Sequence, residues 1–338
     1  MSRNTGGPVA ARACITATAH YAPPNVVENS FFEGHLETTD EWIRTRTGIE
    51  ERRMATSGGT SDLIVPAALE ALEARGLSPS DIDCIIVATI TPDRLCPSTA
   101  AAVQRKIGAL TAWGFDLSAA CSGFIYGVVT AAKLVESGAA RRVLLCGADL
   151  MTSIIDPEDR NTAILFGDGG GVVIIEASDD PEIGIIDSCL RMDGRGEDSL
   201  FIPAGGSRMP ATAETVANRQ HYVLQDGPTV FKAAVSGMSE VTATVMRRND
   251  LTADDIDWFV PHQANIRILQ SVGKRLGFEP ERVMLNLNRY GNTTGGTIPL
   301  CLSEWNAAGR IEHGDRLLLS SFGAGFTMGS VYLRWAIG

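Results

Sequence analysis

One cysteine lies in a sequence context that favours chemistry. Cys121 follows an apolar run, lies among small residues in the segment 116–124 (DLSAACSGF), and begins a segment with helical spacing. The free N–H groups and the positive dipole end of a helix stabilise a thiolate, so we expect a cysteine pKa lowered into the reactive range. We therefore predict that Cys121 is a nucleophile. The alternative is a small buried core cysteine, which is the expected role of most of the seven cysteines.

Two polar residues in the second half of the chain have side chains that can take part in chemistry. His262 follows a short apolar strand, and Pro261 holds it rigidly at the strand end, where ligands of α/β sheets gather. Asn292 lies in a glycine- and threonine-rich loop over residues 288–296. A neutral amide beside an imidazole can donate to a developing oxyanion. The alternatives are a histidine that caps the next helix and an asparagine that serves only turn geometry.

Other glycine, histidine and cysteine patterns point away from cofactors. A small-residue turn over residues 321–327 follows an apolar run and can offer unhindered backbone N–H groups. The glycine run 167–171 matches neither G-x-x-x-x-G-K-(S/T) nor G-x-G-x-x-G, the two glycine spacings that bind nucleotide phosphates. We therefore expect a turn that leads into a strand. The five histidines form no close pair and no C-x-x-C occurs. We predict no metal site and no nucleotide cofactor.

The elements that position these residues occur twice. Leu77–Ile86 resembles Leu251–Val260, whose residue numbers differ by 251 − 77 = 174, and the same offset places Gly295 on Cys121. This repeat predicts an internal duplication that brings two equivalent turns together near a pseudo-twofold axis. The alternative is a chance similarity between strands of like composition.

Strands and helices alternate within each half. Near-continuous apolar strands predict sheets covered on both faces, and two such halves predict an α/β fold, a five-layered α/β/α/β/α sandwich. We expect the first half over residues 1–178, the second over 179–338, and an insertion at about 185–230. The first-half periodicity predicts helices over 61–75, 99–107 and 122–137 and strands over 82–90, 112–117, 142–147 and 171–176.

The composition is that of a globular protein and restricts the partners. The 338 residues include 29 basic and 40 acidic side chains, a net charge of −11 that disfavours nucleic acid and anionic membranes. No apolar run is long enough to span a membrane, and the first residues lack the apolar core of a signal peptide. The odd, scattered cysteines do not predict a disulfide framework. We expect a cytoplasmic protein.

Taken together, the motifs resemble the thiolase-like ketosynthases, and most closely the β-ketoacyl-acyl-carrier-protein synthase III family. The resemblance runs nearly the full length of the chain. It implies a thiolase-like fold, a homodimer, and a catalytic triad of Cys121, His262 and Asn292. The motifs that carry it are Ser118–Phe124, Val260–Asn265, Tyr290–Thr294, Phe322–Thr327, and Thr39–Ile43 with Arg46–Ile49.

The resemblance also implies a reaction. Cys121 takes an acyl group from an acyl-CoA, while backbone N–H groups of Cys121 and Gly323 hold the oxyanion. Malonyl-acyl carrier protein then loses CO₂, His262 and Asn292 hold the enolate oxygen, and Phe322 shields the site. The enolate carbon attacks the acyl group and gives 3-oxoacyl-acyl carrier protein, which starts fatty-acid synthesis. Acyl-CoA is a substrate here, and no cofactor is implied.

For coenzyme A, the family's aromatic–arginine clamp on the adenine matches Trp42 and Arg160, with Arg46 available for phosphate. The alternative for Trp42 is a half-buried packing residue.

A local basic patch is predicted on the helix after His262. Arg267 and Lys274 are seven residues apart, so they lie on one helix side, with Arg275 nearby and Lys232 a further contributor. Although the chain as a whole is acidic, this local basic patch can dock the acidic carrier protein. The alternative is an ordinary solvated helix face.

The sequence departs from the family pattern at two places. Cys96 lies where many relatives carry a phenylalanine that closes the acyl pocket of the neighbouring subunit, so we expect room for starters longer or more branched than acetyl. Gly295–Gly296 replaces a more usual alanine pair.

Three other functions stay open at this point. They are a secondary-metabolite ketosynthase or acyltransferase on the same fold, a non-catalytic dimer that binds acyl-CoA or carrier protein, and a hydrolase. No acidic residue stands in a motif beside His262, which disfavours the hydrolase. The starter group, the carrier and the pathway are not determined by the sequence.

Overall fold

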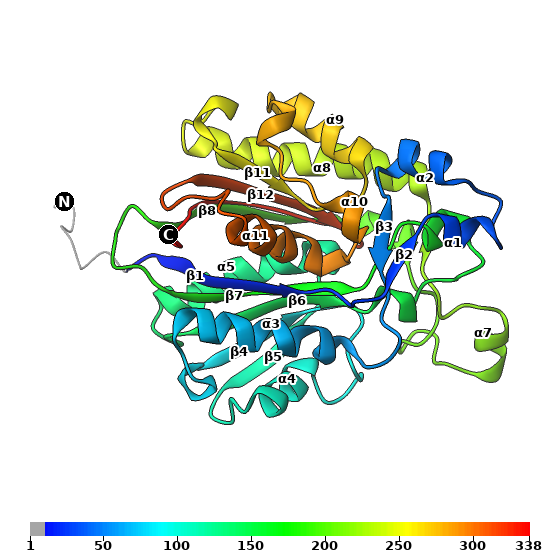
Figure 1. Ribbon diagram of the computed structural model, residues 1–338, viewed down its shortest axis with the longest axis horizontal. Coiled ribbons are helices and arrows are strands. Elements are labelled where there is room, and N and C mark those ends of the chain that lie inside the picture. Colours follow the sequence, from blue (N-terminus) through cyan, green and yellow to red (C-terminus); the bar gives the residue numbers. More distant parts are fainter. Residues whose placement is uncertain (1–10) are drawn as a thin grey trace.

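Two sheets and three helical layers alternate in the structure. The computed structural model describes residues 11–338. Figure 1 shows the expected order of helices, sheet, helices, sheet and helices, so the α/β/α/β/α prediction is confirmed. The expectation about a signal peptide concerns residues 1–10, which lie outside the described residues. Within residues 11–338, no helix combines the length and apolar character needed to cross a membrane.

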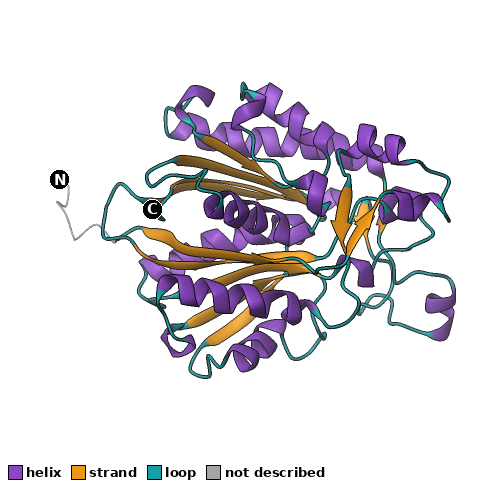
Figure 2. Ribbon diagram, in the orientation of Figure 1, coloured by secondary structure: helices purple, strands orange, loops and turns teal. Residues whose placement is uncertain are grey.

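The first sheet has the strand order β1-β7-β6-β4-β5. In it, β4 is parallel to β5 and β6, and β7 is antiparallel to both β6 and β1. Strands β4, β6 and β7 are apolar and buried because helices cover both faces of the sheet. Helices α3 and α4 cover its outer face, and α5 and α11 lie between the two sheets (Figures 1 and 2). The bounds are β1 Ala13–Tyr21, β4 Cys84–Ala88, β5 Trp113–Leu117, β6 Val143–Asp149, β7 Gly169–Ala177, α3 Thr60–Arg75, α4 Thr99–Ile107, α5 Gly123–Glu136 and α11 Thr297–Ala307.

The second sheet has the order β11-β12-β13-β8, with β11 parallel to β12 and the other pairs antiparallel. Helices α8 and α9 cover its outer face (Figure 1). The bounds are β8 Gly184–Met192, β11 Trp258–Pro261, β12 Arg316–Gly323, β13 Thr327–Arg334, α8 Gly227–Arg248 and α9 Ile266–Leu276.

The repeat seen in the sequence is present in the backbone. Strands β4 and β11 begin 258 − 84 = 174 residues apart, which is the offset found in the sequence, and helices α5 and α11 also begin 297 − 123 = 174 residues apart. Ala120 and Thr294, related by the same offset, are both non-glycine residues with positive φ, 48° and 54°. The two turns therefore share an unusual conformation, and the duplication is confirmed.

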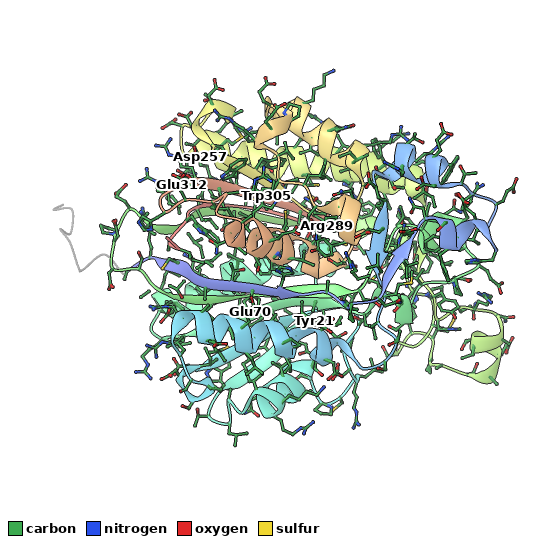
Figure 3. All side chains as sticks on the ribbon, in the orientation of Figure 1. Tyr21, Glu70, Asp257, Arg289, Trp305 and Glu312 are labelled. Carbon is green, nitrogen blue, oxygen red and sulfur yellow. The ribbon has the colours of Figure 1, made fainter. Side chains whose placement is uncertain are left out.

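The two halves pack tightly where these turns meet. A Cβ on Gly147 would lie 2.4 Å from the carbonyl oxygen of Gly295, so only glycine fits there. Trp305 of α11 lies between the sheets (Figure 3) and belongs to the core cluster that both sheets share.

Small elements gather at one end of the sandwich, on the right of Figure 1. They include a two-stranded β2–β3 ribbon and the helix that carries Trp42. Their bounds are β2 Val26–Glu28, β3 Glu51–Arg53, α1 Ser30–Glu33, α2 Asp40–Thr47, α6 Arg160–Ala163, β9 Leu200–Phe201, α7 Ala213–Ala217, β10 Leu224–Gln225 and α10 Leu287–Tyr290.

The expected insertion at 185–230 needs correction at both ends. Residues 184–192 form β8, which pairs with β13, and Gly227 already begins α8. Buried Ile185 packs in the core cluster that both sheets share, and buried Cys189 packs in the cluster beneath α8 and α9. The polar residues of the segment hide this strand in the sequence. The insertion is confined to residues 193–226, which consist of loops and the short elements β9, α7 and β10. The predicted boundary at 178/179 falls in the loop between β7 and β8.

Candidate active site

Residues from both halves line one cavity of about 650 Å³. The first half contributes Cys121, and the second contributes His262 and Asn292, together with Phe322 and Gly323. Cys121 directly precedes α5, His262 directly follows β11, Phe322 and Gly323 end β12, and Asn292 lies in the loop between α10 and α11. The three predicted triad residues are therefore brought to one site.

Cys121 lies in a 3-10 turn, Ala120–Ser122, directly before α5. Ala120 in front of it has the left-handed conformation, a strained setting that recurs at functional sites. The carbonyl of Cys121 accepts a hydrogen bond from Ser321 Oγ at 2.7 Å, which ties the turn to β12.

The expected lowering of the Cys121 pKa is wrong. Burial raises the pKa of this thiol to about 12, and the charge of Asp149 adds to the increase. The side chain is only 8% exposed, so loss of water around a thiolate outweighs the attraction of nearby N–H groups. At rest Cys121 is a neutral thiol.

His262 directly follows β11 and is almost completely buried. Its backbone N–H donates to Ser320 O at 2.8 Å, and its ring Nδ1 lies 2.7 Å from Thr297 Oγ1. Burial lowers the pKa of His262 to about 3, so the imidazole is neutral at physiological pH. No carboxylate within residues 11–338 hydrogen-bonds to the ring, unlike the base-orienting acid of a hydrolase triad.

Asn292 is held by its backbone and by one side of its amide. Its N–H donates to Leu165 O at 2.9 Å, and its C=O accepts from Gly167 N at 3.1 Å. Its Oδ1 accepts from the N–H of Thr294 at 2.8 Å. Because an N–H can bond only to the oxygen of the amide, Nδ2 is left as the donor on the cavity side.

Gly323 creates the space beside the nucleophile. A Cβ at residue 323 would lie 2.8 Å from the backbone nitrogen of Cys121 and 3.0 Å from that of Ser122. The N–H of Cys121 is thus accessible only because residue 323 has no side chain. Phe322 is buried, lines the cavity, and packs against Phe326 with ring centroids 4.8 Å apart.

The other two polar residues near His262 serve the fold. Gln263 donates to Pro261 O at 2.7 Å and to Met284 O at 3.1 Å, and accepts from the Asn286 N–H. Asn265 caps α9.

The predicted coenzyme A residues lie together at the cavity. Trp42 and Arg46 line it, and the Arg46 guanidinium carbon is 5.1 Å from the Trp42 ring centroid. The Arg160 guanidinium carbon is 5.0 Å from the same centroid, and its Nη1 donates to Glu37 O. An adenine stacked between the Arg160 guanidinium and the Trp42 ring would require these two groups to lie about 7 Å apart, which is twice a van der Waals contact of ~3.5 Å. Arg160 must therefore move away from Trp42 before a purine can be sandwiched.

The predicted docking residues lie on the outer helices. Arg267 lines the cavity and packs over Phe231, with its guanidinium carbon 5.7 Å from the ring centroid. All four basic side chains are exposed, and within residues 11–338 none of them forms an ion pair: Lys232, Arg267, Lys274 and Arg275.

Cys96 is not brought to this site. It is exposed and does not line the cavity of its own chain. The expectation for Cys96 invoked a neighbouring subunit, so it stays a prediction.

Sequence reasoning missed two buried residues of the site. Thr297 contacts the ring of His262, and Asp149 accepts from the N–H of Gly295 at 2.9 Å and from Thr89 and Ile90. An acidic residue directly after an apolar strand was a signal for Asp149. Nothing in the sequence places Thr297 at a histidine 35 residues away.

Comparison with known proteins provides separate evidence on the family. Residues 115–194 match the family model for 3-oxoacyl-[acyl-carrier-protein (ACP)] synthase III, and residues 246–335 match the model of its C-terminal part. A Chlorobaculum tepidum protein named beta-ketoacyl-[acyl-carrier-protein] synthase III is 52% identical over 327 residues, 96% of this chain and 99% of that protein.

Solved structures extend the similarity to the fold. The 3-oxoacyl-[acyl-carrier-protein] synthase III of Aquifex aeolicus has a TM-score of 0.88 at 38% identity, over 96% of this chain and 100% of that chain. The priming beta-ketosynthase from the R1128 polyketide biosynthetic pathway has a TM-score of 0.89 at 33% identity, over 99% of both chains. The matched segments include those that carry Cys121, His262 and Asn292.

Proposed function

Because the chain belongs to the 3-oxoacyl-[acyl-carrier-protein] synthase III family, we propose that Cys121, His262 and Asn292 carry out its reaction. The enzyme is an acyltransferase, the ketosynthase that initiates fatty-acid synthesis. It condenses an acyl-CoA starter with malonyl-acyl carrier protein to give 3-oxoacyl-acyl carrier protein, CO₂ and coenzyme A. The observation that carries the residue assignment is the shared cavity lined by all three side chains.

Acylation comes first. The sulfur of Cys121 attacks the thioester carbonyl, and the oxyanion is held by the N–H groups of Cys121 and Gly323. The carbon–sulfur bond to coenzyme A then breaks, and the thiol proton ends on the departing coenzyme A sulfur. The space that Gly323 leaves beside the Cys121 nitrogen supports this assignment.

Condensation comes second. Malonyl-acyl carrier protein loses CO₂, and the enolate oxygen accepts hydrogen bonds from the imidazole of His262 and from Nδ2 of Asn292. The enolate carbon attacks the acyl carbonyl, the bond to Cys121 breaks, and the released thiolate takes a proton from solvent to restore the neutral thiol. Phe322 covers the site with an apolar ring, which favours loss of a carboxylate as neutral CO₂.

The division of labour is tested by following the two half-reactions separately. Mass spectrometry after incubation with a panel of acyl-CoAs reports acylation, and a second incubation with malonyl-acyl carrier protein reports condensation. We expect the acyl group on Cys121 and none on Cys121→Ala. His262→Ala and Asn292→Ala should still acylate but condense about 100- to 1000-fold more slowly. Equal loss of both steps in these two variants would overturn the assignment.

Coenzyme A is proposed to bind at Trp42, Arg46 and Arg160, with the adenine stacked on the indole. Trp42→Ala should raise KM for acyl-CoA by about tenfold, because stacking on one aromatic ring contributes ~1–3 kcal/mol. An unchanged KM would exclude the indole from the binding site.

The carrier protein is proposed to dock on Lys232, Arg267, Lys274 and Arg275. The charge-reversing pair Lys274→Glu and Arg275→Glu should raise KM for malonyl-acyl carrier protein, and added salt should reduce the difference. Arg105→Glu on α4 is the matched control. A salt-independent effect would argue against electrostatic docking.

The enzyme is proposed to work as a homodimer in the cytoplasm, with Cys96 of one copy facing the acyl pocket of the other. Cysteine is smaller than phenylalanine, so starters longer or more branched than acetyl should be accepted. Preference for acetyl-CoA over every starter of four to eight carbons would refute this.

A second candidate function is favoured by the similarity to a polyketide priming ketosynthase. The two functions share the chemistry and differ in the carrier protein that is used. Comparing condensation rates with malonyl groups on fatty-acid and polyketide carrier proteins separates them.

A further inference from the structure

Thr297 provides the hydrogen-bonding partner of the catalytic imidazole. It is the first residue of α11 and is 3% exposed, and its hydroxyl lies 2.7 Å from Nδ1 of His262. Within residues 11–338 the other ring nitrogen, Nε2, makes no hydrogen bond, and His262 lines the cavity. The contact therefore acts on the buried side of a ring whose other side is available to substrate.

The proton position on this ring decides what His262 can do. Burial keeps the imidazole neutral, and a neutral imidazole has one N–H donor and one bare acceptor nitrogen. A proton on Nε2 makes His262 a donor toward the cavity, which an enolate oxygen requires. A proton on Nδ1 would make it an acceptor there, which repels an enolate.

The hydroxyl of Thr297 has two acceptors within reach. One is Nδ1 of His262 at 2.7 Å, and the other is the carbonyl of Thr294 at 3.2 Å. The Thr294 carbonyl already accepts the backbone N–H of Thr297. The shorter contact has the normal length of a bond from an O–H donor, and the bare imidazole nitrogen would otherwise have no partner.

We propose that Thr297 is a positioning residue whose hydroxyl donates to Nδ1 of His262 and so holds the proton on Nε2, facing the cavity. The inference rests on the proposed role of His262 as a donor to the enolate oxygen. Thr297 itself touches no reacting atom. It sets the orientation of the ring and the protonation of its substrate-facing nitrogen.

The direct test is ¹⁵N NMR of the full-length wild-type enzyme labelled at histidine. The ¹⁵N shifts of an imidazole distinguish a protonated nitrogen from a bare one, and the His262→Ala variant identifies the His262 signals among the five histidines. We expect a proton on Nε2 and a bare Nδ1. A proton on Nδ1 would overturn the proposal, and this measurement needs no Thr297 variant.

Variants supply the kinetic test. Thr297→Val keeps the shape and removes the hydroxyl, so decarboxylation of malonyl-acyl carrier protein should slow by about tenfold, the effect of ~1.4 kcal/mol. Acylation of Cys121 should be affected less. Thr297→Ser should restore decarboxylation and the wild-type ¹⁵N shifts.

A matched control separates positioning from stability. Thr244→Val removes a small buried hydroxyl that donates to Glu240 O and accepts from Arg247, both within α8, and it should leave decarboxylation unchanged. If His262→Ala condenses normally, the proposed function fails. If His262→Ala fails to condense and Thr297→Val matches wild type in rate and shifts, only the role of Thr297 fails.

Discussion

At the residue scale, the thiol of Cys121 must lose its proton in a place from which water is largely excluded. Burial disfavours the thiolate, and the neutral imidazole of His262 supplies no positive charge to offset this. Stabilisation has to come when the substrate arrives, from N–H donors that face the developing oxyanion. The resting site thus holds a neutral thiol, a neutral imidazole and a neutral amide.

This state predicts the pH dependence of alkylation. A pKa raised to about 12 leaves the thiol protonated at neutral pH, so the thiolate fraction grows about tenfold per pH unit below that value. Iodoacetamide labelling of Cys121, followed by peptide mass spectrometry, should therefore accelerate from pH 7 to pH 9 without a plateau. A plateau below pH 8 would mean that the helix end lowers the pKa after all. Cys121→Ser reports the background from exposed Cys96.

At the scale of elements, the two repeats end equivalent strands with different residues. Strand β6 ends at Asp149 and β12 at Gly323, and these two positions are related by the offset of the internal repeat. The Asp149 carboxylate accepts from the N–H of Gly295, whereas Gly323 leaves the N–H of Cys121 open. In one repeat a carboxylate of the chain itself accepts from this N–H, and in the other repeat the equivalent N–H faces the position that we propose for the substrate oxyanion.

Substitution of Gly323 tests this difference. The φ of Gly323 lies outside the left-handed region, so Gly323→Ala is compatible with the backbone, but its Cβ would crowd the Cys121 nitrogen. We expect acylation to fall about 100- to 1000-fold, the loss typical of one oxyanion donor. Gly206→Ala, at an open position with nothing within 4 Å, should acylate like wild type. Normal acylation by a folded Gly323→Ala protein would remove residue 323 from the oxyanion site.

At the scale of the whole molecule, β5 leaves one edge of the first sheet without a strand neighbour in the part of the chain that the structure describes. Trp113 at its start is 46% exposed, Leu110 three residues before it is 72% exposed, and Leu95 in the loop before α4 is 89% exposed. An apolar edge strand is a template for pairing, and a twofold dimer pairs two copies of one strand in antiparallel fashion. We propose β5 as the centre of the dimer interface.

A charge at this edge should separate the subunits. In the proposed dimer, Trp113→Asp places two carboxylates near the twofold axis, so we expect sedimentation velocity to show a dimer for the wild type and a monomer for the variant. Leu69→Asp on α3, 44% exposed in the wild type, is the matched control and should stay dimeric. A dimeric Trp113→Asp protein would move the interface away from β5.

The sequence alone predicted the residues to which the proposed chemistry is assigned and the order of the elements that carry them. Periodicity predicted helix 99–107 and four strands of the first sheet but not β1, and the internal repeat predicted two matching turns, because side-chain patterns are local and a duplication preserves them. The limits of β8 and α8 were hidden by polar residues, since pairing with a distant strand outweighed local composition.

Only the tertiary structure decided how the site is tuned. It reversed the expected direction of the Cys121 pKa shift, assigned Gln263 and Asn265 to the fold, and placed Thr297 and Asp149 at the site. The physical reason is that desolvation and hydrogen bonding depend on distances across the packed halves, and residue spacing along the chain does not contain those distances.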